Sequence, residues 1–107
     1  MVKISIFSPN TPGARFDLHS SLHQHMPLAL AKLSASPGFR GVSVERGIAG
    51  AQPGSAPTYI ALCQYLFDSA EAYVAAFEPH AEVLKADMPN YTDIPVVIQS
   101  SAVELTQ

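Results

Sequence analysis

Apolar and polar residues alternate along four segments of the chain that are rich in β-branched or aromatic side chains. These segments cover residues 2–8, 39–47, 58–67 and 95–105. Alternation with a period of two is typical of a β-strand whose two faces differ. The pattern therefore predicts four strands, separated by stretches rich in proline, glycine and serine.

Two stretches between these strands carry apolar residues at intervals of three and four, the spacing of one helical face. The first follows Asp17, a residue type that caps helices. Its predicted inward face consists of Leu18, Leu22, His25, Met26, Ala29 and Leu33. The second begins with Asp68 as its predicted cap, and its inward face consists of Tyr73, Phe77, His80 and Leu84. Pro27 and Pro79 lack an amide donor, so each helix is expected to bend or restart there.

The resulting order is βαββαβ, which predicts the α+β class. This order is typical of a ferredoxin-like fold, a four-stranded antiparallel sheet with both helices packed on one face. A length of 107 residues predicts a single domain covering residues 1–107.

The third strand has apolar residues on both faces. We expect Cys63, Tyr65 and Phe67 to lie with Phe7 and Val97 on the face without helices. An exposed apolar patch of this kind marks a partner surface, and a two-fold homodimer would bury it. Gln64 would then face the helices, where it either binds a ligand or satisfies a neighbouring backbone group.

Composition and charge exclude several classes of partner. The chain is 48% hydrophobic and 14% charged, with a net charge of −3. Scattered basic residues give no footprint for nucleic acid or an anionic membrane surface. We expect no transmembrane segment and no signal peptide, because no apolar run is long enough. The single Cys63 excludes a disulfide framework, and the expected compartment is the reducing cytoplasm.

His25 and His80 are the predicted catalytic residues, because imidazole transfers protons near neutral pH and both lie on apolar stripes. Tyr91 and Asp93 follow in a loop before the last strand, where Tyr91 could donate to an oxyanion and Asp93 could orient an imidazole. The alternative is structural: an inward histidine is often a packed core residue, and Asn90 and Asp93 are also ordinary turn residues.

The predicted ligand-binding residues are the remaining side chains of these stripes and of the loop. They are Leu22, Met26, Gln64, Phe77 and Asn90. We expect no metal and no cofactor. His19 and His23 have a metal-ligand spacing but lack a third ligand, so a solvated helix face is the favoured interpretation.

Three short motifs stand out in the helices and the loop: His-Met-Pro-Leu at residues 25–28, Phe-Glu-Pro-His at 77–80 and Pro-Asn-Tyr-Thr-Asp-Ile at 89–94. Together with residues 9–17 and 67–69, they resemble the EthD family, named from the degradation of ethyl tert-butyl ether. The resemblance implies a subunit of the dimeric α+β barrel kind with a small cavity between sheet and helices. It also implies a haem monooxygenase system as a functional partner. Similar barrels include cofactor-free monooxygenases, cyclases and isomerases.

Two functions remain open from the sequence. The first is a cofactor-independent enzyme of small-molecule catabolism that acts by proton transfer on an apolar small molecule, as an isomerase, cyclase or monooxygenase. The second is a non-catalytic binding or carrier protein for an apolar intermediate of a monooxygenase pathway.

Overall fold

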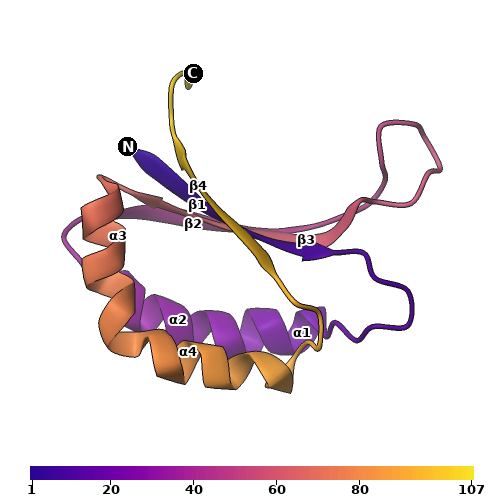
Figure 1. The fold of residues 1–107 in the computed structure, drawn as a ribbon, viewed down its shortest axis with the longest axis horizontal. Helices are drawn as coiled ribbons and strands as arrows, with labels where there is room; N and C mark the ends of the chain where they lie inside the picture. The colour runs from indigo at the N-terminus through magenta and orange to yellow at the C-terminus, as the bar shows by residue number, and fades with distance from the viewer.

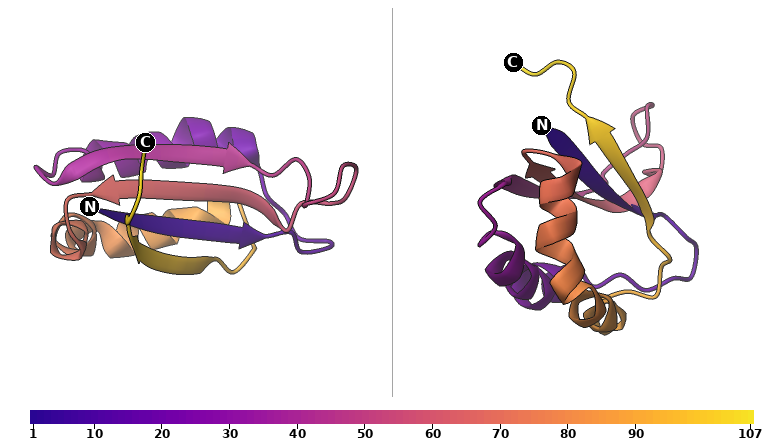
Figure 2. Two further views of the ribbon diagram at one scale, coloured as in Figure 1. Left: turned by 90° about the horizontal axis from the view of Figure 1, so that it is seen from above. Right: turned by 60° about the vertical axis from the view of Figure 1, so that its left-hand side comes forward.

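A four-stranded antiparallel sheet with helices on one face makes up the protein (Figure 1). The computed structural model describes residues 1–107. The strands are β1 (Val2–Pro9), β2 (Phe39–Arg46), β3 (Tyr59–Phe67) and β4 (Val97–Ala102). They lie side by side in the order β2-β3-β1-β4 (Figure 2), which confirms the predicted ferredoxin-like arrangement. No helix combines the length and apolar composition needed to cross a bilayer.

The first helical region consists of α1 (Leu18–Ser20), the wide π turn η1 (Ser21–His25) and α2 (Met26–Leu33). Asp17 caps it as predicted, because its carboxylate accepts a hydrogen bond from the Ser20 N–H at 3.1 Å. The restart of the helix at Pro27 is also confirmed.

The π turn changes which residues face inward. The Met26 N–H donates to the Ser21 carbonyl, five residues back, and Pro27 has no N–H to offer the preceding turn. The extra residue in this turn buries Ser21 and leaves Leu22 40% exposed. The predicted inward position of Leu22 is therefore wrong.

The second helical region consists of α3 (Ala70–Phe77), η2 (Glu78–His80), α4 (Ala81–Asp87) and η3 (Met88–Asn90). Its cap is Ser69, whose hydroxyl accepts from the Ala72 N–H at 3.1 Å. The predicted cap, Asp68, instead pairs with the Arg40 guanidinium at 2.6 Å, which corrects the prediction.

The chain turns a corner at Pro79, so that α3 and α4 run in different directions (Figure 1). His80 lies at this corner with a φ of −117° and a ψ of 5°, outside the helical region. The predicted break at Pro79 is confirmed.

The core lies between the sheet and the helices, and it includes the side chains that were expected on the opposite face. Tyr65 is 4% exposed and Phe67 is fully buried. Antiparallel register pairs Tyr65 with Ile4 and Cys63 with Ile6, so these residues share one face of the sheet. The sequence-based assignment of Cys63, Tyr65 and Phe67 to the helix-free face is therefore wrong.

The helix-free face carries the other row of β3, because neighbouring residues of a strand point to opposite faces. Leu62 pairs with Phe7, and Phe7 pairs with Val97 on its other side. Gln64 lies on this outer face and donates to the Ser5 hydroxyl at 3.4 Å. The predicted ligand contact of Gln64 in the cavity is wrong for this reason.

Candidate functional site

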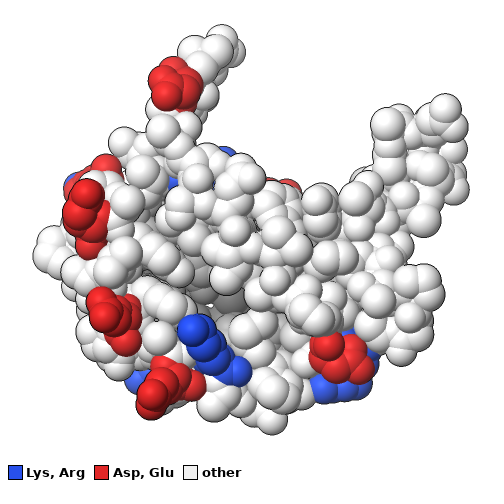
Figure 3. Space-filling model, viewed as in Figure 1, with Lys and Arg blue, Asp and Glu red and all other residues white.

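A cavity of about 290 Å³ lies between the sheet and the helices, and 16 of its 20 lining residues are hydrophobic. The volume falls at the lower end of the range of small-molecule sites. Figure 3 shows the surface hollowed between the sheet and the helices, beside a Lys or Arg side chain. The cavity therefore fits a small, largely apolar molecule.

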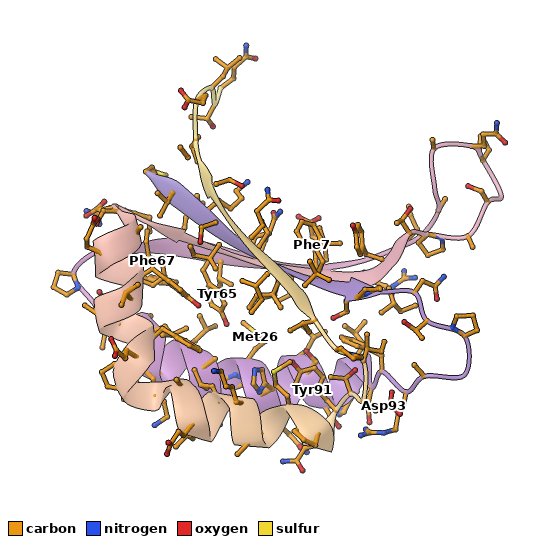
Figure 4. All side chains as sticks on the ribbon, viewed as in Figure 1. Phe7, Met26, Tyr65, Phe67, Tyr91 and Asp93 are labelled. Carbon is orange, nitrogen blue, oxygen red and sulfur yellow. The ribbon has the colours of Figure 1, made fainter.

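Met26 lies between the sheet and the helices, where the sulfur atoms and tyrosine rings of the cavity meet (Figure 4). The Tyr65 hydroxyl approaches the Met26 Sδ at 3.9 Å, and the Cys63 Sγ approaches it at 4.0 Å. Burial raises the pKa of the Cys63 thiol to about 11 and raises the pKa of Tyr65 well above its ordinary value. Both groups therefore stay protonated at neutral pH.

His25 is the one histidine in the cavity wall. Its Nδ1 lies 2.8 Å from the Asp87 Oδ2, in a pair whose side chains are 12% and 23% exposed. The Asn90 amide donates to the other carboxylate oxygen of Asp87 at 2.8 Å. Asn90 therefore holds Asp87, and Asp87 holds the imidazole.

The charge of Asp87 fixes the tautomer of His25. Hydrogen bonds from His25 and Asn90 lower the pKa of the Asp87 carboxyl, so at neutral pH Asp87 is an ionised carboxylate that only accepts hydrogen bonds. The His25 Nδ1 must then carry the proton that it shares with Asp87. In the tautomer with its single proton on Nδ1, Nε2 carries a free lone pair.

Tyr91 lies against the His25 ring, with 4.8 Å between ring centroids and 48° between planes. It is 8% exposed and lines the cavity. Burial raises its pKa to about 12. Tyr91 therefore remains a neutral phenol, a hydrogen-bond donor next to the imidazole.

Contacts with the loop after β1 fix the position of Tyr91. The Asp17 N–H donates to the Tyr91 carbonyl at 2.7 Å, and Phe16 packs edge-on against the Tyr91 ring at 5.6 Å. The Thr92 hydroxyl donates to the Arg15 carbonyl at 3.0 Å. Segments about 75 residues apart in sequence are thereby joined beside the cavity.

Five of the nine predicted site residues do not line the cavity, and one of these, Asn90, contacts the site only through Asp87. Asp93 is exposed and accepts from the Arg15 backbone N–H at 2.8 Å, so it ties two loops together and does not orient a histidine. His80, Leu22 and Gln64 also do not line the cavity. The expected convergence of His25 and His80 is therefore wrong, because the corner at Pro79 carries His80 away.

The remaining predicted residues are brought together. His25, Met26, Phe77 and Tyr91 all line the cavity, and Asn90 takes part through its hydrogen bond to Asp87. Their roles in binding or catalysis remain predictions.

Asp87 is the functional candidate that sequence reasoning missed. It follows Leu84 by three residues, so extending the apolar stripe of the second helix by one turn would have pointed to it. Tyr65 and Cys63 were also missed as cavity residues, because the strand face was assigned the wrong way round. Tyr73 was predicted to face inward but was not named as a site residue, and it lines the cavity.

No group of three His, Cys, Asp or Glu side chains comes together in positions that could hold a metal ion. His19 and His23 lie in contact, with 4.4 Å between ring centroids, and both are exposed. Their predicted place on a solvated helix face is confirmed.

Comparison with known proteins identifies relatives in both sequence and structure. The EthD domain matches residues 14–95. The chain is similar to an EthD-like protein from Ralstonia eutropha JMP134, with 37% identity and a TM-score of 0.90 over 99% of this chain and 94% of that one. No curated protein sequence matches the chain significantly.

More distant structures share the fold. An EthD family protein from Bacillus halodurans C-125 is 18% identical, with a TM-score of 0.70 over 96% of this chain and 98% of that one. SnoaB, a cofactor-independent oxygenase from Streptomyces nogalater, is 14% identical, with a TM-score of 0.57 over 98% of this chain and 93% of that one. These likenesses agree with the dimeric α+β barrel type of ferredoxin-like fold. Because the EthD domain matches most of its length, the chain belongs to the EthD family.

Proposed function

We propose that the protein is a cofactor-independent enzyme that removes a proton from a small, apolar molecule bound in the cavity. The observation that carries this proposal is the His25–Asp87 hydrogen bond of 2.8 Å at the wall of an apolar cavity. An ionised carboxylate on Nδ1 orients the imidazole, leaves Nε2 as the base and stabilises the imidazolium that forms.

In this mechanism the His25 Nε2 takes a proton from a phenol or from a carbon next to a carbonyl. The electron pair left behind moves onto the phenolic or carbonyl oxygen. Tyr91 donates a hydrogen bond to that oxygen, because its raised pKa of about 12 keeps the phenol protonated. The apolar walls exclude water, which strengthens both interactions.

The deprotonated molecule is a common first intermediate of several reactions. Protonation at another atom gives isomerisation, attack on an internal electrophile gives cyclisation, and reaction with dioxygen gives oxygenation. Likeness to the cofactor-independent oxygenase SnoaB supports this class through the fold alone.

The alternative function is a non-catalytic carrier for an apolar pathway intermediate. The observation that favours it is the lining, in which 16 of 20 residues are hydrophobic. In a carrier, His25 and Tyr91 would only shape the cavity.

The proposal of a haem monooxygenase system as the functional partner rests on the resemblance to the family's namesake. The cytoplasm remains the proposed compartment, because Cys63 is a free thiol.

Hydrogen–deuterium exchange of a bound probe separates the two functions. The probe is 2-tetralone, an apolar ketone with acidic hydrogens next to its carbonyl, and its loss of proton signal in D₂O is followed by NMR. We expect wild-type protein to accelerate the exchange, and His25→Ala to lose about 10²–10⁴ of that acceleration.

His80→Ala is the matched control, because His80 does not line the cavity. It should exchange the probe at the wild-type rate. Accelerated exchange that survives in His25→Ala would refute the proposal that His25 is the base. Binding of 2-tetralone by wild-type protein without any accelerated exchange would favour the carrier.

We also propose a homodimer through the helix-free face of the sheet. Phe7, Leu62 and Val97 form an apolar row across three strands of this face, and Val97 is 53% exposed. Burial of such side chains contributes about 1.5–3 kcal/mol each, which favours association. The proposal thus keeps the predicted face with Phe7 and Val97, and it replaces the predicted residues of β3 by Leu62.

A further inference from the structure

Lys85 is the single Lys or Arg side chain that lines the cavity. It lies exposed on α4 and forms no salt bridge with any carboxylate. Glu82 and Asp87 are the carboxylates nearest to it in sequence; neither forms a salt bridge with Lys85, and both oxygens of Asp87 are bonded to His25 and Asn90. The Lys85 ammonium therefore has no anionic partner within the protein, although it borders an apolar cavity.

A shallow hollow on the surface shares Lys85 and Met88 with the cavity, so the two spaces meet at these residues. Arg15 lines the same hollow. Its guanidinium donates to the Pro89 carbonyl and forms no salt bridge, while its backbone N–H is bonded to Asp93. Asp93 lines the hollow as well, with one carboxylate oxygen held by the Arg15 backbone N–H. The hollow thus carries two cations and one carboxylate in a protein whose net charge is −3.

We propose that the ligand of the cavity is an apolar molecule that carries one carboxylate, which pairs with Lys85 where the cavity meets the hollow. The apolar part fills the cavity, and the carboxylate stays partly hydrated at its edge. The proposal rests on the proposed function, since it names the class of substrate for the same site.

Pairing with Lys85 also fixes the orientation of the ligand in the cavity. An apolar cavity selects a molecule by size and shape, and it does not fix which end enters first. An anchored carboxylate keeps the charged end at the edge and presents the rest of the molecule to His25 and Tyr91. The simpler interpretation is a solvated lysine whose methylene stem covers apolar surface, and the two interpretations differ in how binding depends on ligand charge.

The test compares two probes with the same apolar body, 4-phenylbutyrate and 4-phenylbutan-1-ol, by isothermal titration calorimetry. We expect wild-type protein to bind the carboxylate about two- to fivefold more tightly than the alcohol, the range of an exposed ion pair. Lys85→Gln should abolish this preference and leave the alcohol affinity unchanged. Lys85→Arg should restore it, and 0.5 M salt should weaken carboxylate binding alone.

Lys32→Gln is the matched control, because Lys32 lies on α2 and does not line the cavity. It should bind both probes as wild-type protein does. Equal affinity for the two probes, a preference that survives Lys85→Gln, or no binding of either probe would overturn the proposal. Binding is measured without turnover, so failure of the His25 exchange experiment leaves this result intact, and the reverse also holds.

Discussion

Replacement of Asp87 by alanine should destabilise the protein more than removal of any exposed carboxylate. The substitution leaves the Nδ1 of His25, whose side chain is 12% exposed, without its partner at 2.8 Å. An unsatisfied buried donor costs about 1–3 kcal/mol. Such a loss is a large part of the about 5–15 kcal/mol that stabilises a typical domain.

Asp68→Ala is the matched control because it removes the same charge. Asp68 accepts two hydrogen bonds from the Arg40 guanidinium, at 2.6 and 2.7 Å, but both side chains are 48% exposed. Solvent competes for both partners, so this pair is expected to contribute about 0–1 kcal/mol. A larger loss of stability in Asp87→Ala than in Asp68→Ala would therefore be due to the burial of the His25–Asp87 pair, because both variants lose an ion pair.

Urea unfolding of the three proteins at pH 7 measures both losses in free energy. At acid pH, the difference in unfolding free energy between Asp87→Ala and Asp68→Ala should disappear. The hydrogen bonds to Asp87 lower its pKa from the ordinary 3.8, so the stability they contribute is complete above that value and is lost as the pH falls through the lowered pKa. Equal losses for the two variants, or a loss for Asp87→Ala that is as large at pH 3 as at pH 7, would refute the reasoning.

Two further predictions concern the dimer face and the cavity thiol. Val97→Lys, a change at a 53% exposed position of the outer row, should give monomers in light scattering after size exclusion. Val83→Lys, a change at a 49% exposed position on α4, should not. An unchanged Val97→Lys dimer contradicts the interface. Cys63, with a pKa raised to about 11, should react with a disulfide reagent at pH 8 about a hundredfold more slowly than a free thiol, since only the thiolate attacks. A rate within tenfold of glutathione argues against a protonated, buried thiol.

The order of strands and helices could be predicted from the sequence, because caps, helix breaks and apolar spacing each depend on residues close together in the chain. The Asp17 cap and the breaks at Pro27 and Pro79 depend on backbone groups within one or two turns. The inward positions of His25, Met26 and Phe77 followed from helical periodicity over short distances. These features could therefore be predicted without knowledge of tertiary packing.

The face of β3 could not be predicted, because both of its rows are apolar. Which row faces the helices depends on the register with β1, where Ile6 meets Cys63. Register is a long-range property, and a shift of one residue exchanges the two faces. Gln64 was placed in the cavity through the same error, and Tyr65 was placed outside it.

The irregular turns at the two prolines explain both the errors on the helices and the assembly of the site. The π turn before Pro27 moves Leu22 outward and puts Ser21 on the cavity beside His25. The corner at Pro79 lets α3 cover the Phe67 end of the sheet while α4 runs beside α2 (Figure 2). Helix α4 carries Asp87 to His25, 62 residues away. Of the predicted stripe, His80 at the corner does not line the cavity, whereas Phe77 before it and Leu84 after it do. The interruption at Pro79 therefore decides which side chains of a periodic pattern reach the site.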